Sequence, residues 1–450
     1  MKPRLLDDNL YGFDSPQQSY WEASADNPGM NAPALEGNGS CDVAIIGGGY
    51  TGLSAALHLA RDHDVDVQVL EAGHIGWGAS GRNGGFCCVG GSALHGQDLI
   101  KYAGREKARE WYQAAMQSVD YTRSLIADES IDCEPTGNAE ITVAHSRTAA
   151  DKMRSDCDVL PAALGAQLEF ISGDECRERF FASEEMFGAS ISQPTFALHP
   201  LRYCRGLARS AVQHGAKLHQ HSQVIEWNKE ADGTHSLTTE NGRLRARRVI
   251  YACNAFVQED LYPLFYGRTL PVISAIVVTR PLTAAELDLY NWRTENPTAS
   301  SRQLLNYFRL LPDRRFLFGG RGDSTGDAEG ERATYAELVA ALHRIWPQWA
   351  NVEINYRWHG LICFTRSFCP SVGRLADDPS IYFGFGYHGN GVAAASMTGM
   401  LLAEWTGTGK MPAGLPGVAR GLSKRFPLPS LRKQYFQLGL RIARWRDSRG

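Results

Sequence analysis

The sequence lacks a strong charge of either sign: its 450 residues carry 46 Lys or Arg against 49 Asp or Glu, a formal net charge of −3. A chain this close to neutrality gives no electrostatic case for nucleic acid or an anionic membrane as a partner. Its longest apolar run, residues 392–403, is too short to span a bilayer. The N-terminal residues include acids where a signal peptide has its apolar segment. We therefore expect a cytoplasmic protein with no nucleic-acid partner and no integral membrane segment.

The sequence also lacks any C-x-x-C pair, because its ten cysteines are scattered along the chain. Zinc sites and thiol redox motifs depend on such closely spaced pairs. We therefore expect free, buried thiols in a reducing compartment and no bound metal.

The chain is organised around residues 41–85, which open with a buried strand. Residues 43–46, VAII, form the continuous apolar run of a strand covered on both faces. Gly47, Gly49 and Gly52 then give G-x-G-x-x-G at the start of a helical apolar pattern. Such glycines allow a tight turn and let the backbone approach a pyrophosphate at the helix N-terminus. The segment therefore predicts a dinucleotide site.

An acid stands where this kind of site requires one. The apolar run of residues 65–70 ends in Glu71, about 20 residues past the glycines, where a carboxylate bonds ribose hydroxyls. An Arg would be expected there for a 2′-phosphate, so Glu71 favours an unphosphorylated dinucleotide.

A glycine-rich loop follows at residues 76–85, GWGASGRNGG. Its small residues allow the backbone to lie flat along a ligand, while Arg82 supplies a fixed positive charge and Asn83 a neutral donor. A nicotinamide dinucleotide needs no such loop at this point.

A second strand, glycine turn and helix occur near the C-terminus. Residues 381–385 are apolar and are followed by GYHGNGV and a helix of small residues. The N-terminus of that helix would stabilise negative charge on a bound group.

With its GGGYTGLS turn and GASGRNGG loop, the chain resembles the D-amino-acid-oxidase-like superfamily of FAD-dependent oxidoreductases, and within it the gamma-glutamylputrescine oxidoreductase branch. The resemblance implies an α/β fold: a Rossmann-type FAD-binding domain interleaved with an α+β antiparallel-sheet substrate domain. It implies noncovalent FAD held by Gly47, Gly49, Tyr50, Thr51, Gly52, Glu71, Ala72, Gly78, Ala79, Ser80, Arg82, Asn83, Gly84, Gly85, Val224, Gly386, His388, Gly389, Asn390, Gly391 and Val392.

Two local features depart from the superfamily pattern. The usual G-x-x-G-H-G has its His where this chain has Asn390, and His388 stands two residues earlier. Some members attach FAD covalently through a Cys in this region, and Cys363 is the candidate, but a buried free thiol is the favoured interpretation. The carboxylate-binding Lys of sarcosine oxidases would fall near Ala393, which argues against a simple sarcosine-type site.

The same resemblance divides the chain into interleaved parts. We expect an N-terminal arm at residues 1–40 and a C-terminal basic helix at 419–450. The FAD-binding domain should comprise residues 41–97, 198–262 and 352–418, and the substrate domain residues 98–197 and 263–351.

Four residues are candidates for the substrate site. His388 and His359 could contact substrate or serve the fold. Tyr307 and Arg309 stand two apart on an expected strand, so they face the same side, and Arg309 could hold a carboxylate in a bidentate way. Arg321 is a weaker rival for that role.

The resemblance implies oxidation of a CH–NH bond of a polar or acidic small-molecule amine by hydride transfer to flavin N5. The imine then hydrolyses to an aldehyde and an amine, and the electrons pass to O2 or another acceptor. An N-methyl amino acid (sarcosine-like) oxidase or dehydrogenase is the alternative. A nicotinamide-dependent dehydrogenase and a non-catalytic flavin-binding protein are more remote alternatives.

Overall fold

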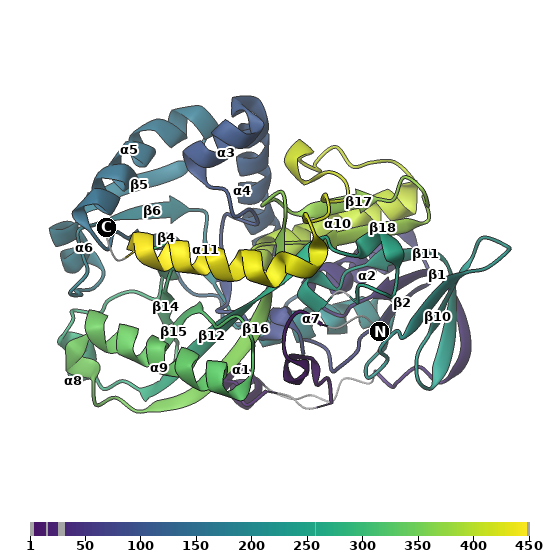
Figure 1. Cartoon of the computed structure of the whole chain (residues 1–450), viewed down its shortest axis with the longest axis horizontal. Helices are drawn as coiled ribbons and strands as arrows, with labels where there is room; N and C mark the ends of the chain where they lie inside the picture. The colour runs from purple at the N-terminus through teal and green to yellow at the C-terminus, as the bar shows by residue number, and fades with distance from the viewer. Residues whose placement is uncertain (1–3, 15–16, 26–31, 257, 448–450) are drawn as a thin grey trace.

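The computed structural model describes residues 4–14, 17–25, 32–256 and 258–447, and it contains two large sheets that lie side by side (Figure 1). One sheet carries the glycine turns, and the other faces them across a cavity. The two sheets therefore supply the two walls of the site.

The first sheet is built on a parallel core with β1, Gly37–Ile46, at its centre. The β1 residues Val43–Ile46 are 5% exposed or less, as expected for a strand covered on both faces. The order is β17-β18-β11-β1-β2-β8, in which β17 alone runs antiparallel to its neighbour. The strands are β17 Ser371–Arg374, β18 Ile381–Phe385, β11 Gly242–Tyr251, β2 Val67–Leu70 and β8 Lys217–His219, with β10 His235–Thr238 and β9 Glu226–Lys229 added beside β11.

Three helices pack together against this sheet: α2, Tyr50–His63; α7, Pro200–Gln213; and α10, Gly391–Thr408. Gly399 of α10 allows the closest approach, because a Cβ there would lie 2.5 Å from the carbonyl oxygen of Thr51 in α2. Small residues in α10 therefore let this helix lie directly on α2.

The second sheet has the order β16-β12-β15-β14-β13-β4-β6-β5. Its strands have two differently placed faces. Ile141 and Val277 lie in an aromatic core with α9, Ala328–Ile345, while their neighbours Glu140, Thr142 and Ile276 line the cavity. The strands are β16 Ile354–Thr365, β12 Thr269–Pro281, β15 Arg315–Arg321, β14 Tyr307–Leu310, β13 Thr298–Ser300, β4 Glu140–Val143, β6 Gly188–Gln193 and β5 Gln167–Ser172.

Smaller elements complete the molecule. Helices α3 Gly96–Ala103, α4 Arg105–Asp128 and α5 Arg147–Leu164 cover the outer side of the cavity. The others are α1 Tyr20–Ser24, α6 Gly173–Arg179, α8 Ala284–Asp288, and the two-stranded pair β3 Phe86–Cys87 and β7 Phe196–Ala197.

Two helices, α3 and α4, are separated at Gly104, whose φ is +84°, a conformation that glycine adopts freely. Residues 220–224 form a loop that lines the cavity, and β9 begins only at Glu226. Two sequence-based expectations need correction. The expected boundary at residue 352 misplaces β16, which is the edge strand of the second sheet. That sheet is also not wholly antiparallel, since β13 and β4 run parallel.

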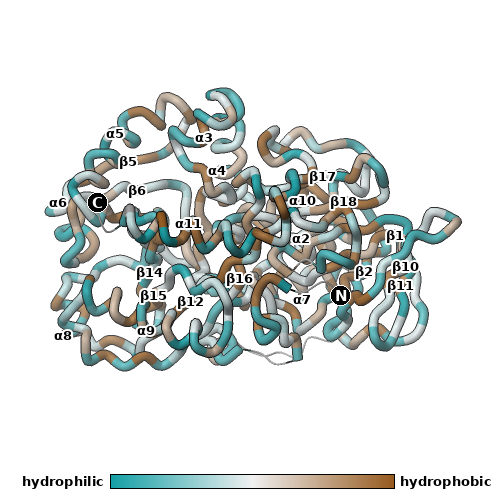
Figure 2. Tube along the Cα trace, viewed as in Figure 1, coloured by the Kyte–Doolittle hydropathy of each residue, from teal (hydrophilic) through white to brown (hydrophobic). Residues whose placement is uncertain are grey.

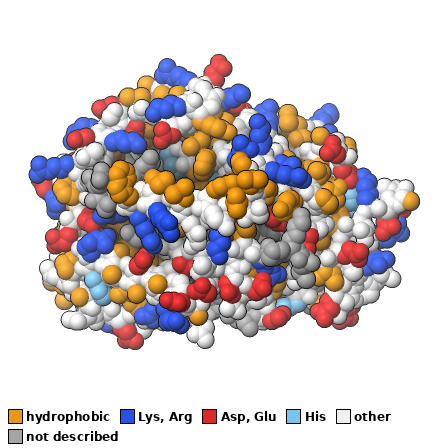
Figure 3. All heavy atoms as spheres, in the orientation of Figure 1, with side chains coloured by type: hydrophobic (Ala, Val, Ile, Leu, Met, Phe, Trp, Pro, Cys, Tyr) orange, Lys and Arg blue, Asp and Glu red, His pale blue; other side chains and the backbone are white. Residues whose placement is uncertain are grey.

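The C-terminal helix α11, Arg432–Asp447, crosses the front of the molecule (Figure 1). Hydrophilic and hydrophobic residues alternate along it, and a row of hydrophobic side chains lies on the surface in its place (Figures 2 and 3). Within the described residues, no helix combines the length and the apolar character needed to cross a membrane.

Candidate active site

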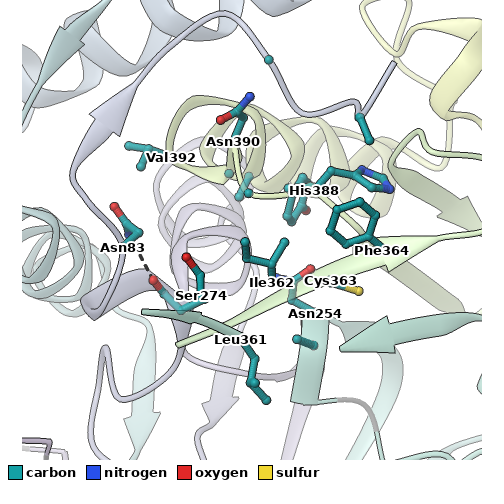
Figure 4. A pocket seen from close by; sticks show the side chains of 18 of the residues that line it. Asn83, Asn254, Ser274, Leu361, Ile362, Cys363, Phe364, His388, Asn390 and Val392 are labelled. Atoms are coloured by element: carbon teal, nitrogen blue, oxygen red, sulfur yellow. Dashed lines mark hydrogen bonds between the residues drawn. The ribbon is translucent and has the colours of Figure 1, made fainter. Parts of the chain in front are cut away.

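A cavity of about 1020 Å³ lies between the two sheets. It is lined at one side by residues that follow β1, β2 and β11, the carboxyl ends of the parallel strands, where α/β sheets bind ligands. The other wall is a face of the second sheet, on which polar residues such as Ser274 and Tyr307 lie beside apolar residues such as Ile362 and Phe364. In Figure 4, Ile362, Cys363 and Phe364 run along β16, while Asn390 and Val392 stand at the start of α10.

The first glycine turn is shaped so that only glycine fits. Gly47 has a φ of +109°, and a Cβ at Gly52 would lie 2.0 Å from the carbonyl oxygen of Gly47. A Cβ at Gly49 would lie 2.8 Å from Oγ of Ser80, whose hydroxyl accepts the N–H of Tyr50 at 3.0 Å. The backbone at the start of α2 is therefore open to the cavity, as a pyrophosphate requires.

Glu71 closes one side of this turn. Its carboxylate accepts the Gly48 N–H at 2.6 Å and the Gly73 N–H at 3.0 Å. Burial raises the pKa of this carboxyl above its ordinary value, although the two N–H groups oppose that shift. Glu71 lines the cavity, in the place expected of a ribose ligand.

The loop of residues 76–85 is fixed around Asn83. The Asn83 side-chain amide donates to the hydroxyl of Tyr50 and to the carbonyl oxygens of Ala79 and Ser80, while its carbonyl accepts the Gly85 N–H at 2.8 Å. Trp21 of the N-terminal arm donates to the backbone oxygen of Asn83 at 2.9 Å. The N-terminal arm therefore holds this loop in place through Trp21 of α1.

Arg82 places a buried cation on the same wall. Its side chain is 7% exposed, stacks 3.9 Å above the ring of Trp77, and leaves Nη2 without a hydrogen-bond partner among the described residues. Burial lowers the pKa of its guanidinium to about 10. An unpaired buried cation beside a glycine turn is a fit for the pyrophosphate of FAD, since each would compensate the desolvation of the other.

The second glycine turn closes the cavity at α10. Asn254, which ends a loop after β11, accepts the Gly386 N–H at 2.9 Å and fixes the turn. α10 begins without a side-chain cap and has no acid in its first turn. The positive end of the helix is thus left for a negatively charged group in the cavity.

His388 serves this turn through both ring nitrogens. Nδ1 donates to the carbonyl oxygen of Gly91 at 3.2 Å, and Nε2 accepts the Thr365 N–H at 3.1 Å. Burial lowers the pKa of His388 to about 4, so the ring is neutral. The imidazole lines the cavity but has no nitrogen free to take a substrate proton.

The other expected substrate residues separate into two groups. Tyr307 lines the cavity, and its hydroxyl lies 2.9 Å from that of Ser274. Arg309 lies on the same face of β14 but under the arm: it is 2% exposed, donates to the carbonyl oxygen of Leu198 at 2.7 Å, and faces the Trp21 ring at 5.5 Å. It does not line the cavity, which corrects its expected role.

His359 is also placed elsewhere. It contacts Gln17 and Glu331 and lies outside this cavity. Arg321, the weaker rival, does line the cavity, with Nη1 buried and without a hydrogen-bond partner in the described parts of the chain. Burial lowers the pKa of Arg321 to about 10.

Most of the expected FAD residues lie together along the cavity wall. Gly52, Gly85 and Gly386 are exceptions that shape the backbone behind it. Cys363 lines the cavity but is 1% exposed, and burial raises the pKa of its thiol far above the ordinary value. It is therefore an unreactive thiol, and all ten cysteines are free.

Sequence reasoning missed Glu140 and Ser274, which line the substrate side of the cavity. A signal for Glu140 existed in the sequence EITV of residues 140–143. Its alternation of polar and apolar residues is typical of a strand with one face turned from the core.

The chain was compared with known protein families and structures. A family described as FAD dependent oxidoreductase (DAO) matches residues 42–405. Gamma-glutamylputrescine oxidoreductase of Escherichia coli (strain K12) is 33% identical over 392 residues, covering 86% of this chain and 88% of that protein. A probable oxidoreductase, OrdL, of Haemophilus influenzae is 30% identical, covering 88% and 89%. Glycine oxidase from Geobacillus kaustophilus has the same fold, with a TM-score of 0.73 at 20% identity over 86% of this chain and 100% of that one.

Proposed function

Because this chain belongs to the DAO family of FAD-dependent oxidoreductases, we propose that it binds FAD noncovalently and oxidises a CH–NH bond of a polar or acidic small-molecule amine. The product imine is then hydrolysed to an aldehyde and an amine, and O2 or another acceptor receives the electrons. The E. coli relative, whose name gives gamma-glutamylputrescine as its substrate, supports an amine as the substrate class.

One observation supports the assignment of cofactor binding to particular residues. Arg82 lies on the cavity wall that holds the glycine turn, and its Nη2 has no hydrogen-bond partner among the described residues. With it, the open N-terminus of α2 would hold the pyrophosphate, Glu71 the ribose, and the start of α10 the negatively charged end of the flavin. Bound there, FAD supplies the two-electron oxidation, which no side chain of the protein can supply.

The protein's own residues orient the substrate and control its proton. Ile362, Phe364 and Val392 give the cavity apolar walls, which disfavour an ammonium ion and so favour the neutral amine that is oxidised. Tyr307 and Ser274 offer hydroxyl groups to the polar part of the substrate. Arg321, with Nη1 unpaired on the same sheet face, is the cation for a substrate carboxylate.

The decisive experiment is the anaerobic mixing of purified yellow protein with a panel of amines, 2-hydroxy acids and polyols. Loss of flavin absorbance with an amine, and with no hydroxy acid or polyol, supports the proposal. Acid precipitation should leave a colourless pellet, because FAD is held noncovalently. A yellow pellet would contradict that part, and bleaching by hydroxy acids alone would contradict the substrate class.

N-methyl amino acids belong in the same panel as the alternative substrates. If they bleach the flavin and amines with a longer polar chain do not, the sarcosine-like alternative replaces the proposal. No bleaching by any compound, with FAD bound, would instead support a flavin-binding protein without catalysis.

A further inference from the structure

A carboxylate on the cavity wall has no role in the arrangement described above. Glu140, the first residue of β4, lines the cavity, and its carboxylate has no hydrogen-bond or ion-pair partner among the residues that the structure describes. Other carboxylates on the wall have partners: Glu71 accepts two backbone N–H groups, Asp156 bonds Gln97, and Glu259 pairs with Arg432. Glu140 therefore stands apart as a negative charge left for a ligand.

Its surroundings make an unpaired carboxylate costly. Directly across the sheet it is paired in register with Ser192, which lies beside Leu168 of β5. Trp111 and Met153 form the opposite wall from α4 and α5. Burial raises the pKa of Glu140 to about 7, with no neighbouring cation to lower it. A cation brought by the substrate would relieve that cost.

Glu140 lies far from the cation on the same sheet face. Arg321 is on β15 and Glu140 on β4, with β14 and β13 between them, so three strand spacings, or roughly 14 Å, separate them across the sheet. The cavity therefore offers a positive group at one end and a negative group at the other, with Tyr307 between them.

We propose that Glu140 binds a second, positively charged group of the substrate, remote from the CH–NH bond that is oxidised. The substrate class is thus an extended amine with a protonated nitrogen at its far end, such as a diamine or a polyamine derivative. This inference rests on the proposed function, because it assigns the distal part of the same cavity.

The test compares 1,4-diaminobutane with 1-aminobutane in anaerobic titrations of the wild type and of the Glu140→Gln variant. Wild type should bind the diamine about 10- to 100-fold more tightly than the monoamine, the scale of one charged hydrogen bond. Glu140→Gln should remove that preference and leave the monoamine affinity unchanged. Between pH 6 and pH 8 the preference should increase in wild type, as Glu140 loses its proton, and stay constant in the variant.

Asp156→Asn is the matched control, since Asp156 is another acid on the wall but already bonds Gln97. It should keep the preference for the diamine. If neither amine is oxidised, binding is measured by the perturbation of the flavin spectrum, which separates failure of the proposed reaction from failure of this inference. Equal affinity of wild type for both amines, or an unchanged preference in Glu140→Gln, would overturn the inference.

An independent observation concerns the outer face of α11. Five side chains spaced along one stripe are between 38% and 58% exposed: Leu431, Tyr435, Leu438, Ile442 and Trp445. Figure 3 shows a row of hydrophobic side chains on the front of the molecule, where α11 runs in Figure 1. The inner face is fastened by polar contacts, since Asp447 accepts the N–H groups of Gln303 and Leu304, and Gln437 bonds Ser324. The helix therefore turns apolar residues outward while it is anchored from below.

The charge around this stripe is basic. Residues 420–447 contain eight Lys or Arg and a single acid, Asp447, although the whole chain is slightly negative. Three of the eight pair with acids, since Arg432 is buried against Glu259 and Arg420 and Arg444 pair with Glu110 and Glu337. Lys424 and Arg425, shortly before the stripe in the chain, and Arg441, next to Ile442, are exposed. A helix with an outward apolar stripe and basic flanks has the composition of one that lies in the interface of an anionic membrane.

We infer that α11 docks the protein on an anionic lipid surface. The test is co-sedimentation of the full flavoprotein with vesicles of phosphatidylglycerol and phosphatidylcholine, and with phosphatidylcholine alone. Binding should require the anionic lipid, weaken with salt, and be lost in Leu438→Asp/Ile442→Asp. The control Val212→Asp removes an exposed apolar residue elsewhere and should bind normally.

Light scattering on the same proteins tests whether a second copy of the chain, instead of a membrane, covers the stripe. A wild-type dimer that dissociates in Leu438→Asp/Ile442→Asp, without vesicle binding by wild type, would mean that a second copy covers the stripe. That result, or equal binding of wild type and variant to anionic vesicles, would overturn the inference.

Discussion

At the scale of single residues, three buried arginines show how position decides the use of the same charge. Arg82, Arg309 and Arg321 each have a pKa lowered to about 10 by burial. Each also has one guanidinium nitrogen without a hydrogen-bond partner among the described residues. Arg82 and Arg321 line the cavity, whereas Arg309 lies under the N-terminal arm and donates to a backbone carbonyl. We therefore assign the pyrophosphate to Arg82 and a substrate carboxylate to Arg321.

Arg321→Gln should weaken anaerobic bleaching by amines that carry a carboxylate by about 1.5 to 3 kcal/mol, the scale of a charged hydrogen bond. Uncharged amines should be almost unaffected, because they make no ion pair with Arg321. The measurement is the apparent dissociation constant from the concentration dependence of bleaching. Arg309→Gln is the control. It should lower the yield of folded protein but should not change the affinity for amines with a carboxylate more than the affinity for uncharged amines. Equal losses for both kinds in Arg321→Gln would assign Arg321 to the fold.

At the scale of elements, two strand–glycine–helix units far apart in the chain present helix N-termini to one cavity. α2 begins at Tyr50 and α10 at Gly391, and the two helices pack directly on each other. Gly399 allows this contact, because a Cβ there would meet the backbone of Thr51 in α2. Gly52 shapes the turn at the start of α2, where a Cβ would meet the carbonyl oxygen of Gly47. The glycines thus fix the position of the two positive helix ends as well as the space between them.

Gly52→Ala should abolish FAD binding, because its Cβ would lie 2.0 Å from the Gly47 carbonyl and would push the turn into the cavity. The ratio of flavin to protein absorbance in the purified variant measures this effect. Gly439→Ala, a glycine in α11 with no atom within 4 Å of a new Cβ, is the control. That control should retain FAD and gain up to about 1 kcal/mol of helix stability. A Gly52→Ala variant with full flavin content would show that the turn can open without loss of the site.

At the scale of the whole molecule, the site exists only where separate layers meet. The first sheet supplies the glycine turns, the second supplies Tyr307 and Arg321, and the arm supplies Trp21, which holds the loop at Asn83. His388 joins these layers as well, since it bonds Gly91 on one side and Thr365 of β16 on the other. Stability of this junction is therefore linked to the charge of His388.

The free energy of unfolding should decrease as pH falls from about 6.5 to about 4. His388 has its pKa lowered to about 4 by burial, so the unfolded chain takes up a proton in that window while the folded chain does not. The contribution of neutral His388 to the free energy of unfolding is complete above pH 6.5 and falls as the pH decreases. It does not exceed about 3 kcal/mol. Other buried histidines with lowered pKa values, such as His199, act in the same direction.

Urea unfolding at several pH values, with His388→Asn, checks this expectation. Asn tolerates the φ of +53° at this position and does not titrate. The variant should be less stable at pH 7 but should lose less stability on acidification than wild type. His221→Asn, at an exposed position with a φ of +50°, is the control and should keep the wild-type slope. An unchanged slope in His388→Asn would contradict the role of His388.

The sequence by itself determined the first glycine turn and the acid beside it on the proposed cofactor side of the cavity, because these features depend on residues close together in the chain. Gly47, Gly49 and Gly52 fix a turn through local sterics, and Glu71 follows at the end of the next strand. These features hold wherever the rest of the chain lies.

Only the tertiary structure decided the substrate half. Strand periodicity correctly put Tyr307 and Arg309 on one face of β14, but it could not show that the arm covers Arg309 and leaves Arg321 open. Glu140 matters because its carboxylate has no partner among the described residues, in a cavity whose walls come from distant segments of the chain. Likewise, the outward stripe of α11 depends on which face its polar contacts anchor. Burial and pairing are properties of neighbours in space, and neighbours in space are set by the packing of layers rather than by local sequence.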